Sequence, residues 1–374
     1  MRPLYVAATG QHVGKTTSTL GLATNIFDKG YNVGYCKPVG QKHVTINGQV
    51  VDKDVALFAQ VLKFPIEANV HSAIVMEKGF TKMYLDDPDK YDLKSRILHS
   101  AGILNSRHEI TIYEGTGHPG VGSVADVSNA DVARILKAGV VMVAEGGIGN
   151  TIDRLALSFA QFRQYKIPVL GVIVNKVLPK KLDQVHHYVG KKLNSLNLEL
   201  LGVIPFDKHL SFPIMETIKR AIRGKFLFHE DKLGNRVESI IAGSLVDITE
   251  FSTFSNLLLV VSFRRLDEAI QKVKSISRMK DLNTPPISGI IITGDGKHES
   301  QSNISSPCLR YIHDNEIPVI STELDTYGSV VKISRIEVKI NTRTPWKTRR
   351  AIELIRENVD VDQILNKLEM VRYH

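Results

Sequence analysis

The chain has 374 residues, of which 43% are hydrophobic and 23% charged, which predicts two soluble domains and excludes a disordered protein. The net charge of +9 is spread along the chain, with 24 Lys and Arg against 18 Asp and Glu in residues 1–208 and 24 against 21 in the rest, so we expect no nucleic-acid partner. The longest apolar run, Leu257 to Phe263, has only the length of a buried strand, which excludes a membrane role.

Residues 1–208 alternate short β-branched runs with helical stretches. The strand-like runs are LYVAA, VGYC, ITIYE, VVMVAE, VLGVIVN and LLGVIP, with helices expected at 17–27, 54–62 and 93–104 among others. Buried parallel strands joined by crossover helices have this pattern. We therefore expect an α/β domain with a doubly wound, mostly parallel sheet.

Residues 209–374 repeat the alternation more faintly. Strands are expected in ESIIAGSL, NLLLVVSF, GIIITG and PVIST, and helices at 214–222, 266–276 and 307–315. The tail, 345–368, has the pattern of two helices broken at ENVDVD. These residues predict a second, smaller α/β domain that ends in C-terminal helices.

The first strand, Leu4 to Ala8, leads directly into the segment TGQHVGKTT. Because the strand leaves no room for a secretory signal, we expect a cytoplasmic protein. The two cysteines, Cys36 and Cys308, lie far apart without CxxC or Cys/His spacing, so we expect reduced, structural thiols and no metal site built on them.

A glycine-containing loop between a strand and a helix N-terminus directs backbone N–H groups at a phosphate. TGQHVGKTT has this context, with Lys15 placed to reach β and γ phosphates and Thr16 to bind magnesium. The usual first glycine of the pattern is Thr9 here, with Gly10 one position later. The expected nucleotide-binding residues of the loop are Gly10, Gln11, His12, Val13, Gly14, Lys15, Thr16 and Thr17.

Three charged residues are expected at the carboxyl edge of the sheet, where open α/β folds bind ligands. Lys37 follows the second strand, as a ligand for a phosphate or acidic substrate or as a solvated lysine before a proline turn. Asp54 opens a helix, as a metal ligand, as its N-cap or as a partner of the helix dipole. Glu114 ends the strand ITIYE beside the phosphate loop, as a magnesium ligand.

Four glycines follow Glu114 in EGTGHPGVGSVADVSNA, which predicts a loop that approaches a substrate, a dimer partner or only solvent. Its candidate substrate residues are Gly117, His118 and Gly120, although a lone loop histidine can be incidental. Glu145, at the end of the next strand, is a further weak candidate. Asn175 ends a strand and offers its amide to a purine, or simply ends a strand at a turn.

The first 208 residues contain, in this order, TGQHVGKTT, YCKPVG, Asp54, YEG and VNK. With this ordered set they resemble dethiobiotin synthetase and the related cobyrinic acid a,c-diamide synthases. The resemblance implies a P-loop NTPase that phosphorylates a carboxylate or carbamate, and a homodimer. It also implies ATP on Lys15 and Thr16, Mg²⁺ on Thr16, Asp54 and Glu114, a γ-phosphate or substrate carboxylate on Lys37, and adenine on Asn175.

The second half resembles the DRTGG domain that follows such a P-loop domain in long bacterial phosphotransacetylases. Three segments carry this resemblance, in the order LVDITEFSTFSNLLLVVSF, SGIIITGDG and DTYGSVVKISRIEVKI. The Asp-Arg-Thr-Gly-Gly core itself is degraded in this sequence. The acyl-transfer domain of those enzymes needs several hundred further residues, so we expect the regulatory front end alone.

Two functions account for these features. The first is an ATP-dependent ligase or ATPase, in which Lys15, Lys37 and magnesium stabilise the transferring phosphoryl group and the loop after Glu114 holds a small carboxylic acid. The second is a nucleotide-gated sensor whose second domain passes the change to a partner. A complete acceptor pocket would distinguish them, and the sequence offers only His118, Glu145 and Lys42 for it.

Overall fold

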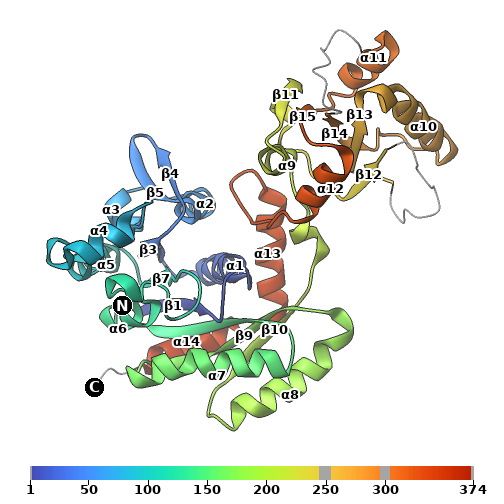
Figure 1. Cartoon of the computed structure of the whole chain (residues 1–374). Helices are drawn as coiled ribbons and strands as arrows, with labels where there is room; N and C mark the ends of the chain where they lie inside the picture. The colour runs from blue at the N-terminus through green and yellow to red at the C-terminus, as the bar shows by residue number, and fades with distance from the viewer. Residues whose placement is uncertain (1, 244–253, 295–303, 372–374) are drawn as a thin grey trace. The chain divides into compact units, whose positions relative to one another are not determined.

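The structure is a computed structural model that describes residues 2–243, 254–294 and 304–371. It divides into two compact units, the first made of Met1–Asp207 together with Ile340–His374 and the second of Lys208–Lys339. Figure 1 shows both units in the colours of the chain. The chain therefore leaves the first unit after its sixth sheet strand and returns to it for the last two helices.

The first unit is built on a six-stranded sheet in the order β10-β9-β8-β1-β7-β2, in which every pairing is parallel. Its strands are β1 (Arg2–Ala8), β2 (Val33–Cys36), β7 (Ile110–Glu114), β8 (Gly139–Glu145), β9 (Val169–Val177) and β10 (Leu200–Pro205). The chain proceeds from β1 to both sides of the sheet, so the strand order reverses beside β1. This is the doubly wound α/β fold that the sequence predicted.

Helices cover both faces of this sheet. One face packs against α5 (Leu93–Arg107), α6 (Asn129–Ile135), α7 (Gly149–Gln164) and α8 (Leu182–Asn194) in one apolar core. The other carries α1 (Lys15–Asp28), α13 (Pro345–Asn358) and α14 (Val361–Met370). The smaller elements between β2 and α5 are β3 (Val39–Gly40), β4 (His43–Ile46), β5 (Gln49–Asp52), α2 (Lys53–Leu62), α3 (Ala68–His71), β6 (Ile74–Val75) and α4 (Phe80–Asp86).

The two C-terminal helices differ from the expectation, which assigned residues 209–374 to the second domain. Helix α13 packs along α1 so closely that a Cβ atom on Gly21 would lie 2.3 Å from Cγ1 of Ile355. Val359 forms an antiparallel bridge with Gly202 of β10. The apolar faces of the tail thus complete the first unit, and only the adjacency of the tail to the second domain in the sequence suggested otherwise.

The second unit contains a smaller mixed sheet in the order β11-β15-β14-β13-β12. Four strands are parallel and follow one another in chain order, and β11 pairs antiparallel at one edge. The elements are α9 (Met215–Ala221), β11 (Lys225–Phe228), β12 (Ser239–Ala242), β13 (Leu257–Ser262), α10 (Leu266–Met279), β14 (Ile287–Thr293), α11 (Ser306–Asp314), β15 (Val319–Thr322) and α12 (Thr326–Ser334). Parts of the expected DRTGG-like motif, at 245–253 and 295–296, lie outside the described residues.

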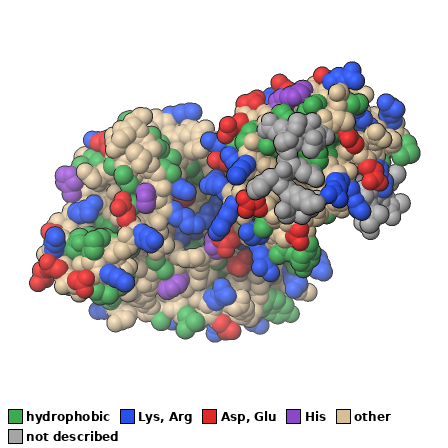
Figure 2. All heavy atoms as spheres, turned by 45° about the horizontal axis from the view of Figure 1, so that its top comes forward, with side chains coloured by type: hydrophobic (Ala, Val, Ile, Leu, Met, Phe, Trp, Pro, Cys, Tyr) green, Lys and Arg blue, Asp and Glu red, His purple; other side chains and the backbone are tan. Residues whose placement is uncertain are grey.

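The surface carries both signs of charge. Figure 2 shows Lys and Arg side chains beside Asp and Glu side chains on both units, in agreement with the even spread of charge along the sequence. Among the described residues, no helix combines the length and the apolar character that a membrane crossing requires.

Candidate functional site

The loop Thr9–Gly14 joins β1 to α1 and has the geometry of a phosphate loop. Gly14 is the N-cap of α1 with a φ of 92°, and no side chain in the described part of the chain caps this helix. The first N–H groups of a helix point toward its N-terminus, and the helix dipole favours an anion there. His12 also has a left-handed φ of 61°, so the loop turns sharply where the sequence has no glycine.

Asn175 lies beneath this loop at the end of β9. Its Nδ2 donates to the carbonyl oxygen of Val13 at 3.0 Å, and its Oδ1 accepts from the N–H of Lys176 at 2.8 Å. A Cβ atom on Gly14 would lie 1.9 Å from Nδ2 of Asn175, so only glycine fits at this position. The amide of Asn175, a residue that is only 6% exposed, therefore supports the phosphate loop. Its predicted contact with a purine stays a prediction.

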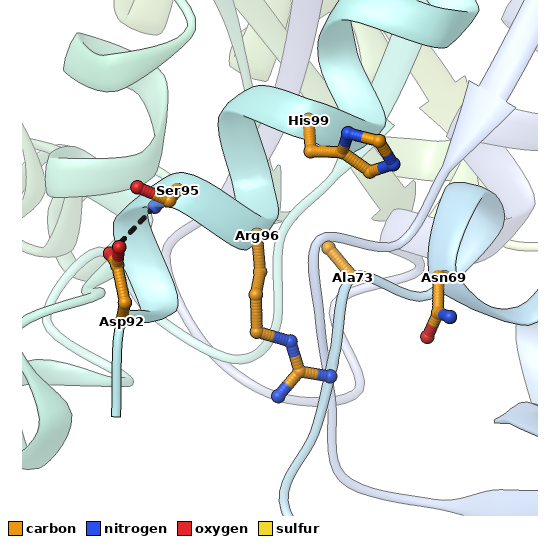
Figure 3. A pocket seen from close by; sticks show the side chains of 6 residues that line it. All are labelled: Asn69, Ala73, Asp92, Ser95, Arg96 and His99. Carbon is orange, nitrogen blue, oxygen red and sulfur yellow. Dashed lines mark hydrogen bonds between the residues drawn. The ribbon is translucent and has the colours of Figure 1, made fainter. Parts of the chain in front are cut away.

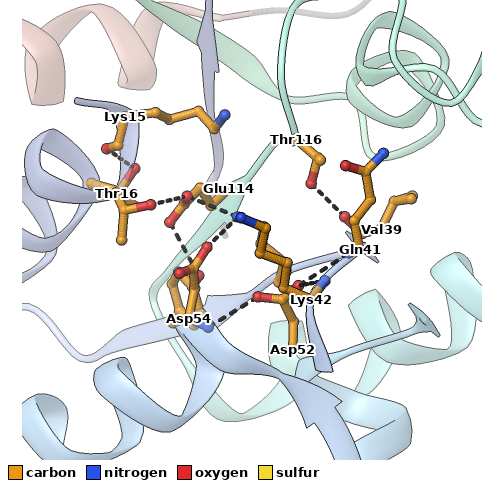
Figure 4. Close-up of polar contacts among 12 residues, drawn as sticks. Lys15, Thr16, Val39, Gln41, Lys42, Asp52, Asp54, Glu114 and Thr116 are labelled. Carbon is orange, nitrogen blue, oxygen red and sulfur yellow. Dashed lines mark hydrogen bonds and ion pairs between the residues drawn. The ribbon is translucent and has the colours of Figure 1, made fainter. Parts of the chain in front are cut away.

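Four predicted residues meet where α1 begins and β2 and β7 end. Thr16 Oγ1 donates to Glu114 Oε1 at 2.8 Å, and Lys37 Nζ lies 2.9 Å from the same oxygen and 2.6 Å from Asp54 Oδ2. Figure 4 shows Thr16, Glu114 and Asp54 side by side, with Lys15 next to them. The edge rule for parallel sheets thus predicted this cluster, because β2 and β7 deliver Lys37 and Glu114 to the same edge.

Asp52 explains why Asp54 is available to this cluster. The carboxylate of Asp52 caps α2 by accepting from the N–H of Asp54 at 2.9 Å, and it also accepts from the N–H groups of Gln41 and Lys42 at 3.2 and 3.3 Å. Asp54 lies in the first turn of the helix, where a carboxylate suits the helix dipole, and its side chain binds Lys37. The alternative in which Asp54 caps the helix is therefore wrong, and Asp52 is a site residue that the sequence analysis missed.

Two residues of the cluster, Lys37 and Glu114, are buried, while Thr16 and Asp54 are half-buried. Glu114 is fully buried and Lys37 is 5% exposed. Burial alone lowers the pKa of Lys37, but the carboxylates of Asp54, Glu114 and Asp52 outweigh it and leave the pKa of Lys37 above its ordinary value. Tyr35 adds a hydrogen bond from its hydroxyl to Glu114 Oε2 at 3.1 Å, and burial and the charge of Glu114 raise the pKa of Tyr35. Lys37 is thus an ammonium ion at neutral pH, not a solvated lysine.

The donor set fits a magnesium ion. It consists of one hydroxyl and two carboxylates, and Mg²⁺ in nucleotide sites takes such oxygens together with waters and phosphate oxygens. Two adjacent ligands of an octahedral Mg²⁺ lie about 2.9 Å apart, close to the 2.8 Å between Thr16 Oγ1 and Glu114 Oε1. Within the described ranges, no group of three or more His, Cys, Asp and Glu residues could hold a metal ion. A magnesium ion at this site would therefore also need the Thr16 hydroxyl, waters and phosphate oxygens as ligands.

The glycine-rich loop after Glu114 is held by Asn129, which the sequence analysis did not select. Asn129 Nδ2 donates to the carbonyl oxygens of Thr116 and His118 at 2.7 and 2.6 Å, and its Oδ1 accepts from Thr116 N–H and Tyr5 hydroxyl. Gly117 is buried, with a φ of 65°, and Gly120 is half-buried. His118 is exposed, and its Nδ1 accepts from the N–H of Gly120 at 3.2 Å.

The remaining predicted residues line the loop from the other side. Glu145 ends β8 with an exposed side chain, 3.4 Å from Nζ of Lys176, and Lys176 also donates to the carbonyl oxygen of His12. Lys176 thus contacts both Glu145 and the phosphate loop. Within the loop, burial varies: Val13 is buried, Gly10, Lys15, Thr16 and Thr17 are half-buried, and Gln11 and His12 are exposed.

A separate pocket lies between α3 and α5 (Figure 3) and contains none of the predicted residues. Its volume is about 430 Å³, and it is lined by Asn69, Ala73, Asp92, Ser95, Arg96 and His99. Asp92 is already engaged as the N-cap of α5, where it accepts from the N–H of Ser95 at 3.0 Å. The pocket is a surface feature apart from the charged cluster.

Comparisons with known proteins agree with the resemblance seen in the sequence. The chain is 28% identical to the ATP-dependent dethiobiotin synthetase of Methanocaldococcus jannaschii over 54% of this chain and 92% of that protein. It is 23% identical to a probable cobyric acid synthase of the same organism, over 68% of this chain and 54% of that protein. The expected relationship of the first unit is thereby confirmed.

The whole chain is similar to part of a larger enzyme. It is 21% identical to a phosphate acetyltransferase of Synechocystis over 99% of this chain but only 52% of that protein. The chain thus spans about half the length of such relatives. This match confirms the expected likeness to the front part of long phosphotransacetylases, while the DRTGG assignment of the second unit stays a prediction.

A family profile decides the membership of the first unit. The profile described as an AAA domain matches residues 2–213, which is more than half of the chain. This range contains the phosphate loop and all four residues of the charged cluster. The chain therefore belongs to this AAA domain family and carries its nucleotide-binding P-loop.

Proposed function

We propose that the chain binds Mg-ATP at the phosphate loop and transfers the γ-phosphoryl group to a carboxylate-type acceptor or to water. The observation that carries this proposal is the cluster of Thr16, Lys37, Asp54 and Glu114 beside the loop. A nucleotide-binding loop alone needs neither the buried ammonium of Lys37 nor the buried carboxylate of Glu114, and such charges are costly to bury. Phosphoryl transfer requires both kinds of group at the γ-phosphate.

Each residue has a role that its position supports. Lys15 would bind the β and γ phosphates, and Thr16, Asp54 and Glu114 would hold the magnesium ion. Bound there, magnesium would neutralise charge on the phosphate oxygens. Lys37 would bind the γ-phosphate or the acceptor carboxylate. For Asn175 we propose positioning of the loop through Val13, because its amide is already engaged there.

ATP and a small carboxylic acid are proposed as substrates because of the relatives. The name of the M. jannaschii relative describes an ATP-dependent synthetase, and the phosphate loop and the cluster belong to the part of this chain that aligns with it. The glycine-rich loop around Gly117, His118 and Gly120 is the proposed acceptor site, with a second copy of the chain as the partner that would close it.

A nucleotide-gated sensor is the second candidate, and the state of the acceptor side supports it. His118 is exposed and accepts from the backbone of Gly120, and Glu145 lies beside Lys176. These contacts of His118 and Glu145 are thus made to Gly120 and Lys176, and neither contact involves Lys37. In this reading ATP orders the glycine-rich loop, and the second unit transmits the change.

Calorimetric titration of ATP with magnesium into the whole chain tests the shared part of both candidates. We expect binding that favours ATP over GTP and that Lys15→Ala weakens at least about 100-fold. Lys53→Ala is the matched control, because Lys53 is an exposed lysine next to Asp54 that is outside the cluster. Failure of the wild type to bind any nucleotide would overturn the proposal.

Single-turnover measurements of ADP release then separate the two candidates. A transferase releases ADP faster when its acceptor is present, so a panel of small carboxylic acids should contain at least one that accelerates the reaction. If ATP binds but no acid changes the rate, the ligase is excluded, and hydrolysis or sensing remains.

A further inference from the structure

The ammonium group of Lys37 lies among the oxygens that were predicted to bind magnesium. Its Nζ is 2.6 Å from Asp54 Oδ2 and 2.9 Å from Glu114 Oε1, and this Glu114 oxygen also accepts from Thr16. All three predicted metal ligands thus belong to one hydrogen-bonded group with Lys37. Lys37 thus supplies positive charge to the same oxygens that a magnesium ion would need.

Lys37 and a magnesium ion would compete for the same pair of carboxylates. A magnesium ion would sit about 2.1 Å from each oxygen ligand, and the same Glu114 oxygen already binds Lys37 at 2.9 Å. Both cations would then stand within a few ångströms of each other in a buried site, where like charges repel strongly. This repulsion favours the departure of one cation from the carboxylates when the other binds.

We propose that Lys37 keeps the metal site closed in the nucleotide-free chain and moves to the γ-phosphate when magnesium arrives with ATP. The proposal rests on the proposed function, since it assigns a second position for Lys37 on the nucleotide. The exchange conserves the charge of the site, because magnesium replaces the ammonium ion between Asp54 and Glu114 and the γ-phosphate becomes the new partner of Lys37.

The backbone around Lys37 allows only its side chain to move. Lys37 follows directly after β2, and its N–H donates to the carbonyl oxygen of His71 at 2.9 Å. Pro38 accepts from the N–H of Ile74 at 2.9 Å. A long side chain on a fixed backbone can change rotamers without disturbing the sheet, which suits a switch between two nearby anions.

The exchange has a thermodynamic consequence that a simple metal site lacks. Metal alone has to displace Lys37 without offering it another anion, so binding without nucleotide is weak. With nucleotide present, the displaced ammonium gains a phosphate, and the two ligands bind cooperatively. Replacing Lys37 by a neutral side chain of similar length removes the competitor and should uncouple metal from nucleotide.

Titration of Mn²⁺, followed by electron paramagnetic resonance on the whole chain without nucleotide, tests the exchange. We expect Lys37→Met to bind Mn²⁺ at least about tenfold more tightly than the wild type. Lys53→Met, an equal change of charge at an exposed lysine beside Asp54, should bind like the wild type. Equal or weaker Mn²⁺ binding by Lys37→Met would overturn the exchange.

The titration separates this inference from the proposed function because it contains no nucleotide. A wild type that binds Mg-ATP, combined with a Lys37→Met variant that gains no Mn²⁺ affinity, contradicts the exchange alone. A wild type that binds no ATP contradicts the proposed function, and the Mn²⁺ titration still decides whether Lys37 blocks the metal ligands.

A measurement on the wild type guards against a Lys37→Met variant that fails to fold. Reductive methylation of lysines, read by mass spectrometry, reports how freely the Lys37 amine leaves its carboxylates. With Mn²⁺ and ADP, which lacks a γ-phosphate, the rate at Lys37 should rise at least about tenfold over the nucleotide-free chain. The rate at Lys53 should stay constant, and an unchanged rate at Lys37 rejects the exchange.

Discussion

The two units of this chain contain similar elements but differ at the carboxyl edges of their sheets. In the first unit, the chain proceeds from β1 to β7 on one side and to β8 on the other. In the second, β12, β13, β14 and β15 follow one another in a single direction. Only the first order creates the reversal beside which open α/β sheets bind ligands.

The side chains at the two edges follow this difference. The first edge gathers a lysine, a threonine and two carboxylates within hydrogen-bonding distance. At the described part of the second edge, Thr293 and Thr326 face each other with hydroxyl oxygens 3.0 Å apart, after strands β14 and β15. Strand content alone therefore does not indicate a nucleotide site, whereas strand order and the charges at the strand ends do.

A pair of glycine substitutions offers the strongest test of this comparison. Alanine at Gly14 would be strained by about 1–3 kcal/mol at its φ of 92° and would overlap Asn175, so we expect nucleotide affinity to fall at least about 100-fold. Alanine at Gly289 of β14 would lie 2.2 Å from Sδ of Met215, a flexible side chain. We expect it to destabilise the second unit by about 1–3 kcal/mol and to leave nucleotide affinity unchanged.

Calorimetry for nucleotide binding and urea unfolding for stability measure both variants. If Gly289→Ala weakened nucleotide binding as much as Gly14→Ala while the protein remained folded, the assignment of nucleotide binding to the first edge would be wrong.

The sequence predicted this edge because its signals are local. Each of Lys37 and Glu114 stands directly after or at the end of an apolar run, and parallel strands bring such positions to one edge. The phosphate loop is a contiguous segment as well. Such features depend on a few neighbouring residues and on a general rule of topology.

Other parts of the site and fold depended on distant residues. The segment VDKD contains two aspartates that could cap the helix. Asp52 is the cap, and its carboxylate also accepts from the N–H groups of Gln41 and Lys42, about ten residues earlier in the chain. Asn129 holds a loop more than ten residues earlier in the sequence. The tail joins the first unit through α1, over three hundred residues away, and no local pattern encodes that contact.

A second prediction tests the place of the tail in the first unit. Alanine at Gly21 would push its Cβ against Ile355 at 2.3 Å and the carbonyl oxygen of Ala351 at 3.0 Å. Overpacking of this kind costs about 1–3 kcal/mol, more than the helix propensity gained by replacing glycine. Urea unfolding should show this loss of stability in the unfolding transition of the first unit. That transition is identified as the one that bound nucleotide shifts to higher urea.

Gly102 of α5 is the matched control for Gly21. It also lies inside a helix of the first unit, but a Cβ atom there meets nothing within 4 Å. We expect Gly102→Ala to stabilise the unit by about 0.5–1 kcal/mol. A Gly21→Ala variant that gains stability by the same amount would show that α13 does not pack against α1.

A third prediction concerns the acid sensitivity of the first unit. His71 is 3% exposed and stacks on Phe64 with ring centroids 4.5 Å apart. Burial lowers the pKa of His71 more than the nearby backbone of Glu67 raises it. The folded chain therefore binds fewer protons here than the unfolded chain at mildly acidic pH.

The sign of the effect follows from this difference. The contribution of neutral His71 to stability is complete above about pH 6.5, the pKa of an unfolded histidine, and is lost as the pH falls toward the lower folded pKa. Urea unfolding between pH 7.5 and about pH 5 measures the free energy of unfolding of the wild type and of His71→Gln. The difference between the two free energies should become smaller as the pH falls. A difference that widens instead means that His71 is charged in the folded chain.

The smallest effect is expected at the surface contact between α1 and α14, which also joins the tail to the first unit. Lys29 Nζ lies 2.7 Å from Oδ1 of Asp362, but both side chains are well exposed, at 38% and 69%. Exposed pairs contribute about 0.5 kcal/mol, and salt screens them. Lys29→Ala should therefore lower the free energy of unfolding by about that amount at low salt and by less at 1 M salt. A loss as large as that of Gly21→Ala would mean that charge, and not the apolar contact of α13 with α1, holds the tail on the first unit.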